Sequence, residues 1–349
     1  MTAIIIIPRS RRSFSSRATA LVAAFFGLAL LSSSALAEPV TITAKSIPAF
    51  RADSDRTHFG DLKFVGGFSF TGSSRHVAGL SGLVVGDGGT SFLAVTDYGY
   101  WISGRIARDE SGVPSGLVDV DVSPMRGPDG RPLTGKIKAD AEGLARRGDQ
   151  AVVSFERAPR ILDYPVDPSI SLAIPRERPQ PIPNRELRAN QGLEALAASP
   201  PGSPLQGALV TVAEGSIDRK GNLFAAIVDG PHRGVFKIAK DEKWNVSDAD
   251  FLPDGDLLLL ERRYEGIFGG LGVRLRRIDG RAIKPGALLD GPVIFEANLS
   301  EEIDNMEGLS VWQDAQGVTR LTLNSDDNGS FFQRNLLLEF ILTDKKAGL

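Results

Sequence analysis

The chain contains no cysteine, and only three of its 349 residues are histidine. Without thiols it can form no disulfide, no thiolate nucleophile and no cysteine-ligated metal site. The histidines, His58, His76 and His232, lie far apart and show no metal-ligand spacing, which argues against a histidine-rich zinc site. Stability must therefore come from an ordinary core, and a bound metal would need oxygen ligands.

Several catalytic signatures are missing as well. No G-x-S-x-G elbow occurs, because Ser81 in "GLSGL" (79–83) is followed directly by glycine. The glycine-rich "FGGLGVRL" (268–275) fails the dinucleotide-binding fingerprint in spacing and context. No segment beyond the N-terminal region shows a long helical period, which argues against a helical fold.

The first 37 residues have the features of an export signal. Two arginines stand in "SRRSF" (10–14), an apolar run follows over residues 18–31, and "ALA" (35–37) is a signal-peptidase site. This pattern predicts twin-arginine (Tat) export and a periplasmic or secreted protein; a Sec signal that happens to hold two arginines is the alternative. The run is short for a membrane span, so no stable anchor is expected after cleavage.

Cleavage after Ala37 would leave one domain, residues 38–349. The removed segment carries four arginines and no acid, so 312 residues with a formal net charge of −7 would remain. A protein this acidic is a poor candidate for binding nucleic acid, which requires a basic surface.

Short apolar runs bounded by glycine, proline, aspartate and asparagine dominate the rest of the chain. They have the length and the Val, Leu and Phe content of strands, and the chain has 38 glycines for turns. The predicted strands are 91–97, 150–156, 208–214, 232–239, 256–262, 272–279, 319–327 and 334–342. Many short strands with few helices predict an all-β barrel, sandwich or propeller. The proline-rich residues 165–183 are expected to form a long loop or an extended excursion over one face.

An internal repeat selects the propeller. "DAEGL" (140–144) has counterparts in "NQGLEAL" (190–196), "NMEGLSV" (305–311) and the weaker "AGLSGLV" (78–84). Each leads into a strand, a turn and a second strand with an acidic end, and the units recur about every 50 residues. A fifth unit runs from Asp248 through "ADFLPDGDLLLLER" (249–262) to its acidic end at Glu261. Five visible units, with the sequence needed to close a ring, favour a single six-bladed β-propeller; five blades are the alternative. Residues 40–47 and 335–343 are the expected partners that close the ring.

The repeated acids are the candidate site. Equivalent positions of successive blades converge at one channel mouth, so a carboxylate ring would form there and would favour a hard cation such as Ca²⁺. The candidate metal ligands are Asp97, Glu142, Glu156, Glu194, Glu214, Glu261, Glu307 and Asp326, the last beside Asp327. The candidate catalytic residues are Glu142, Glu194, Glu307, Arg157 and Arg262, where the arginines would bind phosphate or carboxylate.

Simpler interpretations compete with this site. Acids in repeated turns also satisfy backbone N–H groups, and arginines beside acids also form surface ion pairs. The aromatic residues Trp101, Trp244 and Trp312, with Tyr98 and Tyr100, are expected inside blades rather than around a ligand.

Four stretches together resemble the family called "esterase-like activity of phytase", exported bacterial β-propeller proteins. They are "DAEGLARRGDQAVVSFERAPRILDYPVD" (140–167), "LRANQGLEALA" (187–197), "SDADFLPDGDLLLLERRY" (247–264) and "NMEGLSVW…LTLNSDDNGSFFQRNLLLEF" (305–340). The resemblance extends from about Phe59 to Phe340. It implies a propeller, an exported location and phosphoester or carboxyester hydrolysis. The R-H-G-x-R-x-P signature of histidine acid phytases is absent.

Three functions follow from these observations. The first is hydrolysis of phosphate or carboxylate esters of a small anionic or ester substrate, with calcium held by the carboxylate ring. The second is a calcium-dependent lactonase that uses the same ion to polarise a ring carbonyl. The third is a non-catalytic propeller that binds a ligand or protein in the periplasm, because a fold does not determine a function.

Overall fold

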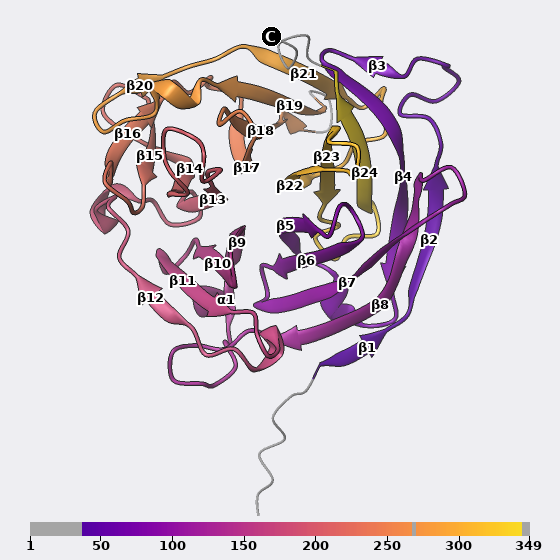
Figure 1. The fold of residues 1–349 in the computed structure, drawn as a ribbon, viewed down its shortest axis with the longest axis horizontal. Helices are drawn as coiled ribbons and strands as arrows, with labels where there is room; N and C mark the ends of the chain where they lie inside the picture. The colour runs from indigo at the N-terminus through magenta and orange to yellow at the C-terminus, as the bar shows by residue number, and fades with distance from the viewer. Residues whose placement is uncertain (1–36, 267–269, 344–349) are drawn as a thin grey trace, which may run out of the picture. The chain divides into compact units, whose positions relative to one another are not determined.

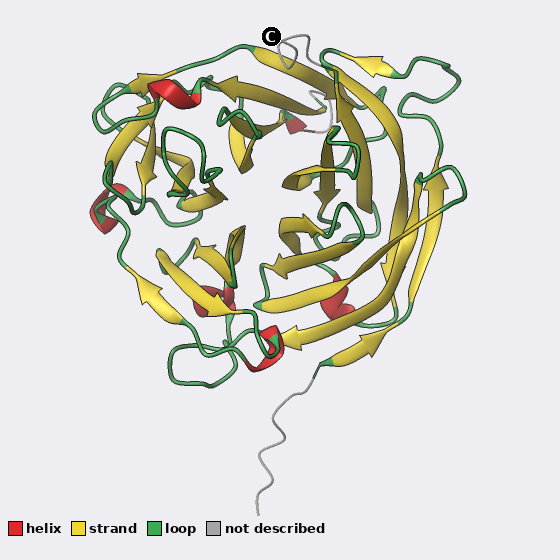
Figure 2. Cartoon of the chain, in the orientation of Figure 1, coloured by secondary structure: helices red, strands yellow, loops and turns green. Residues whose placement is uncertain are grey.

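The computed structural model describes residues 37–266 and 270–343. These residues form an all-β unit of five sheets arranged around a centre, each sheet being one propeller blade (Figure 1). Neighbouring strands are antiparallel except for the outermost pair of the third blade. Strands and loops make up almost all of it, and the helices are single short turns (Figure 2). These turns are η1 (Arg75–Val77), α1 (Lys136–Ala139), η2 (Ile170–Leu172), η3 (Asn184–Glu186) and η4 (Gly280–Ala282).

The blades follow one another along the chain, and the strands of each blade are ordered from the centre of the propeller outwards. Blade 1 contains β5 (Leu80–Gly86), β6 (Ser91–Thr96), β7 (Tyr100–Arg108), β8 (Pro114–Pro124) and β1 (Glu38–Val40). Blade 2 contains β9 (Ala141–Arg147), β10 (Gln150–Phe155), β11 (Arg160–Pro165) and β12 (Arg176–Arg178). Blade 3 contains β13 (Leu193–Ala198), β14 (Leu209–Ile217), β15 (Leu223–Ile227), β16 (Gly234–Ile238) and β20 (Leu288–Leu289).

Blade 4 contains β17 (Asn245–Phe251), β18 (Leu257–Tyr264), β19 (Leu271–Ile278) and β21 (Val293–Asn298). Blade 5 combines the two ends of the described chain: β22 (Met306–Gln313), β23 (Thr319–Ser325) and β24 (Asn335–Leu342), then β4 (Leu62–Gly72) and β2 (Ile42–Ile47), with β3 (His58–Phe59) beside β4. Every inner strand contacts the inner strands of both neighbouring blades.

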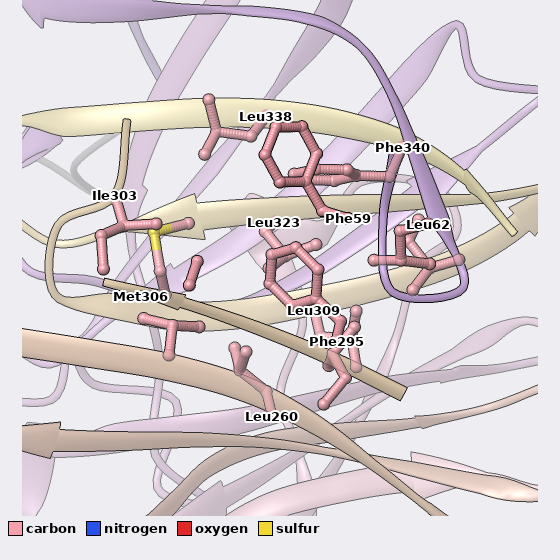
Figure 3. Packing of buried hydrophobic residues seen from close by; sticks show 14 of the residues in the cluster. Phe59, Leu62, Leu260, Phe295, Ile303, Met306, Leu309, Leu323, Leu338 and Phe340 are labelled. Carbon is pink, nitrogen blue, oxygen red and sulfur yellow. The ribbon is translucent and has the colours of Figure 1, made fainter. Parts of the chain in front are cut away.

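The hydrophobic core lies between the blades. Five clusters of buried residues occupy the five spaces between neighbouring sheets. Figure 3 shows the cluster between blades 4 and 5, where Leu260 and Phe295 lie beside Leu309, Leu323 and Leu338. Burying a Leu or Phe side chain contributes roughly 1.5–3 kcal/mol, so these stacked sheets supply the stability that a chain without disulfides needs. The tryptophans Trp101, Trp244 and Trp312 are buried within it, as the sequence predicts, whereas Tyr98 is half exposed.

The predicted number of six blades is wrong, because the structure has five. Residues 38–72 do not form a blade of their own: β1 joins the outer edge of blade 1, and β2 and β4 join blade 5. The expected direct pairing of residues 40–47 with residues 335–343 is also not observed, since β4 lies between β2 and β24. Part of the proline-rich stretch is not a loop, because it contains β12, the outer strand of blade 2.

The predicted export signal (1–37) lies outside the described residues, apart from Ala37. Among the described residues, no helix is long and apolar enough to cross a membrane.

Candidate functional site: an acidic cavity lined by all five blades

A β-bulge near the start of each inner strand sets the first ring of site residues. In every blade, the pairing of the inner strand with the second strand shifts by one residue at the same point. The extra residue is Ser81, Glu142, Glu194, Ser247 or Glu307 in blades 1 to 5. These five positions are equivalent around the propeller axis, because the bulge falls at the same point of each inner strand. A bulge also redirects its side chain out of the regular alternation of the strand. Glutamate therefore occupies three of the five.

The second ring of site residues lies near the end of the second strand of each blade, opposite the start of the inner strand. The backbone N–H groups of Asp97, Glu156, Glu214 and Asp326 each donate to the carbonyl of the residue directly before their blade's inner strand. In blade 4 the residue at this point is Arg262, which pairs with Asn245. Four blades thus place a carboxylate here and blade 4 places a guanidinium.

Glu261 was predicted to belong to this ring, and that placement is wrong by one residue. Neighbouring residues of a strand point to opposite faces, so the shift from 261 to 262 reverses the side chain's direction. Glu261 is 1% exposed, and its two carboxylate oxygens accept hydrogen bonds from Arg274 (2.7 Å) and Arg276 (2.5 Å). It is the centre of a buried ion network inside blade 4.

The two rings enclose a cavity of about 230 Å³ at the end of the channel where the inner strands begin. Residues of all five blades line it: Ser81, Asp97, Glu142, Glu156, Asn190, Glu194, Glu214, Arg262, Glu307, Asp326 and Asn328. Seven of these residues are acidic and one is basic. The structure therefore brings together every predicted metal ligand except Glu261, and we call this site the acidic cavity.

Two groups of three carboxylates within or beside the acidic cavity are close enough to share an ion. One oxygen from each of Glu156, Glu194 and Glu214 lies within 4.8 Å of the other two. The same holds for Asp140, Glu142 and Glu156, so Glu156 belongs to both groups. An oxygen-only donor set of this kind suits a hard cation such as Ca²⁺.

Glu194 is the least compensated of these acids. Its side chain lines the acidic cavity and is 5% exposed, yet among the described residues no side chain or backbone N–H donates to its carboxylate. Glu142, by contrast, accepts from the Ser81 hydroxyl (2.9 Å), and Glu307 accepts from the Asn305 amide (2.6 Å). A buried carboxylate without a partner is unfavourable unless it binds a proton or a cation.

Burial and the close packing of the carboxylates raise the pKa values of several acids in the cavity. Burial, reinforced by the Glu142 and Glu214 carboxylates, raises the pKa of Glu194 well above its ordinary value. Burial and the neighbouring carboxylates raise the pKa of Glu156 to about 7. Burial also raises the pKa of Glu307 to about 7, although the Arg262 guanidinium opposes this shift. These acids hold protons at pH values where ordinary glutamates are ionised.

The basic residues occupy two distinct places. Arg262 lies in the acidic cavity and pairs with Glu307 (2.9 Å) and Glu214 (3.4 Å). Arg157, which was predicted to be catalytic, does not line the cavity, because its guanidinium pairs with Asp140 (3.0 Å). Asp140 also pairs with Lys136 (2.7 Å), which contacts Asp97 as well. Arg157 and Lys136 therefore neutralise the edge of the acidic cavity beside blades 1 and 2.

Sequence reasoning missed four polar residues of the site. Ser81 could have been found, since it stands where the other repeats carry glutamate. Asp140 is the first residue of the "DAEGL" repeat, but nothing in the sequence shows that it shares a cation-sized group with Glu142 and Glu156. Asn190 and Asn328 reach the acidic cavity from loops, which follow no period.

These features define the chain as a five-bladed β-propeller with an acidic cavity at one mouth of its channel. The family model described as "Phytase-like: Esterase-like activity of phytase" matches residues 75–329. The chain therefore belongs to the phytase-like family, and the resemblance stated from its motifs is confirmed. No curated protein sequence matches the chain significantly.

Solved structures match the chain only at low similarity. Myxococcus xanthus glutaminyl cyclase is 15% identical with a TM-score of 0.41, over 88% of this chain and all of that chain. An endo-arabinase from Bacteroides thetaiotaomicron is 9% identical with a TM-score of 0.45, over 75% and 92% of the two chains. Likenesses this distant say nothing of the reaction, which must be argued from the site.

Proposed function

We propose that the protein is a cation-dependent hydrolase of phosphate or carboxylate esters, with its reaction centre in the acidic cavity. The observation that carries this proposal is Glu194, which is buried, has no hydrogen-bond donor among the described residues, and lies within 4.8 Å of two further carboxylates. Membership of the phytase-like family supports the reaction class. The calcium ion and the choice of ester are inferences from the donor set and the family.

The residues fit a hard cation. Glu156, Glu194 and Glu214 form one set of ligands, and Asp140 with Glu142 and Glu156 forms an adjoining set. Ca²⁺ takes six to eight oxygen ligands with flexible geometry, which several carboxylates and water would complete. When bound, such an ion would polarise a phosphoryl or carbonyl oxygen of the substrate.

The other residues of the acidic cavity bind and orient the substrate. Among the described residues, Arg262 is the one arginine that lines the acidic cavity. It would donate hydrogen bonds to the negative oxygens of the substrate and to charge that develops during hydrolysis. Glu307 is held by Arg262 and Asn305 on the side of blade 5, where it would orient a water molecule toward the ester. Ser81 keeps the Glu142 carboxylate directed by its hydrogen bond.

Calcium binding and ester turnover of the Glu194→Gln variant test the proposal. We expect calorimetry to show a loss of Ca²⁺ affinity of at least about 100-fold, because the change removes a ligand rather than an outer contact. Turnover of p-nitrophenyl phosphate or p-nitrophenyl acetate should fall with it. The matched control is Glu296→Gln, since Glu296 is half exposed on the outer strand of blade 4.

Unchanged Ca²⁺ affinity and turnover in a folded Glu194→Gln protein would remove the basis of the proposal. Hydrolysis of sugar lactones alone, with neither p-nitrophenyl ester turned over, would instead identify a lactonase. Tight calcium binding without turnover of any ester or lactone would identify a non-catalytic binding propeller.

A further inference from the structure

The loop that follows β23 presents two phenylalanines to solvent. Phe331 and Phe332 are 97% and 91% exposed, the highest values among the exposed large hydrophobic residues of the described chain. Their rings contact each other edge to face, with centroids 5.9 Å apart. Leaving two adjacent phenylalanines in water forgoes a large apolar contribution to stability, so an exposed pair is a candidate for binding an apolar group.

The base of this loop is part of the wall of the acidic cavity. Asp326 and Asn328 line the cavity, and the Asp326 carboxylate accepts hydrogen bonds from the backbone N–H groups of Asn328 (2.8 Å) and Gly79 (2.9 Å). Consecutive Cα atoms are about 3.8 Å apart, so the Cα of Phe331 lies at most roughly 11 Å from that of Asn328. The exposed pair is therefore within reach of a single small molecule whose polar end lies in the acidic cavity.

Local hydrogen bonds give the loop a defined shape. The Ser330 backbone N–H donates to the Asp327 carbonyl (2.6 Å), and the Gly329 N–H donates to the Asp327 carboxylate (3.0 Å). The same carboxylate accepts from the Asn335 amide (2.9 Å), which ties the loop to the first residue of β24. The phenylalanines are thus presented by a turn fixed at both ends.

A third exposed aromatic residue, Tyr98, lies near Gly79, whose backbone N–H bonds Asp326. Tyr98 is 50% exposed and follows Asp97, a residue of the cavity wall. A Cβ added at Gly79 would lie 2.8 Å from the Tyr98 ring, and the backbone N–H of Gly79 bonds Asp326. Tyr98 therefore borders the base of the phenylalanine loop, and we call Tyr98, Phe331 and Phe332 the aromatic sector.

We propose that the aromatic sector binds the apolar acyl or aryl group of the substrate while the acidic cavity holds its ester or anionic end. The substrate class is then an amphiphilic ester rather than a small, wholly polar one. This inference rests on the proposed function for the position of the reacting group. The polar cavity and the apolar sector are complementary to the two ends of such a molecule, and they adjoin at Asp326.

Binding of two non-hydrolysable probes, octylphosphonate and methylphosphonate, tests the inference with the full chain. Calorimetry with and without Ca²⁺ should show that the wild type binds octylphosphonate at least about tenfold more tightly, because the octyl chain is buried against the aromatic rings. The double variant Phe331→Ser with Phe332→Ser should bind the two probes about equally and keep its affinity for methylphosphonate. Leu288→Ser is the matched control, since Leu288 is an exposed apolar residue on the outer strand of blade 3.

Equal affinity of the wild type for the two probes, or discrimination that survives in the double variant, would overturn the inference. Co-sedimentation with phosphatidylglycerol vesicles that depends on the phenylalanines, without discrimination between the probes, would overturn it in favour of a lipid surface. Failure of the proposed function is recognised separately, because it appears as calcium binding and turnover that do not depend on Glu194.

Discussion

Glu194 and Glu261 are both almost fully buried glutamates, yet their carboxylates differ in the hydrogen-bond donors around them. Two arginines donate to the carboxylate of Glu261, whereas no described residue donates to that of Glu194. The first is a structural ion network, and the second is a site for a cation or a proton. Burial and charge alone could not separate the two roles, because only the partners differ.

Replacing Glu261 by glutamine should destabilise the protein by roughly 3–5 kcal/mol, because Arg274 and Arg276 would keep their buried charges without the carboxylate. Urea denaturation measures this change, and calcium affinity should stay within about twofold of wild type. The same substitution at Glu194 is the comparison: it should leave the calcium-free protein at pH 8 equally or more stable. A Glu261→Gln protein that kept its stability but lost calcium would contradict this assignment.

At this scale the sequence predicted much of the site. Glu142, Glu194 and Glu307 followed from the repeated motif, and Asp97, Glu156, Glu214 and Asp326 from the strand ends; the structure places all seven in one cavity. Their roles as ligands or catalysts remain predictions. Glu261 was misplaced because the bulge in β17 falls at Ser247, and no sequence rule fixes a bulge to the residue.

At the scale of the strand, the glycine that recurs in the repeated motif allows neighbouring inner strands to approach closely. A Cβ at Gly143 would lie 2.5 Å from the backbone of Glu194 and Leu196 in the next blade, and one at Gly82 would lie 2.6 Å from the backbone of Glu142 and Leu144. In blades 1 and 2 the residue after the bulge therefore faces the neighbouring inner strand, and only a glycine hydrogen fits there. Blade 3 has Ala195 at this position. The reason is close approach rather than backbone freedom, because neither glycine has a positive φ.

Blade 4 meets the same requirement differently. Its residue after the bulge is Asp248, whose carboxylate accepts a hydrogen bond from the backbone N–H of Leu309 (2.8 Å) in blade 5. Asp250, two residues on, accepts from the N–H of Val311 (2.7 Å). Acids in this blade therefore join strands instead of lining the cavity, and this blade carries no Glu-Gly-Leu motif.

Gly143→Ala should cost about 1–3 kcal/mol in unfolding free energy, because the added methyl group must push two inner strands apart. It should also weaken calcium binding, since Glu142 and Glu194 lie on those strands. Gly202→Ala is the matched control, because a Cβ there meets no atom within 4 Å and its φ is not positive. Equal unfolding midpoints for the two variants in urea would show that the inner strands can separate freely.

For the molecule as a whole, the acidic cavity links stability to pH and to calcium. A carboxyl group whose pKa is raised in the folded state binds protons more tightly there than in the unfolded chain. Its contribution is therefore fully present below its ordinary pKa and is lost as pH rises through the folded value. The relevant window runs from the ordinary values near 4 up to about 7 for Glu156 and Glu307, and to about 6 for Asp326.

We therefore expect the melting temperature of the calcium-free protein to fall as pH rises from about 4.5 to 7. Saturating Ca²⁺ should flatten this dependence, because the ion replaces the protons, and it should release protons near pH 6. Differential scanning calorimetry in EGTA and in calcium measures both effects. A melting temperature that rises over this range in EGTA and is unaffected by calcium would refute the linkage.

The all-β class, the strands and the acidic repeat could be predicted from the sequence, because alternation, turn residues and periodicity are local properties. Only the tertiary structure decided that there are five blades, since the pairing of β4 with β24 joins residues far apart in the chain. It also decided which acids meet in the cavity, because a one-residue bulge selects the face of a strand. The same applies to the aromatic sector: Tyr98 and the phenylalanine loop become neighbours only through the contacts of Gly79 with both.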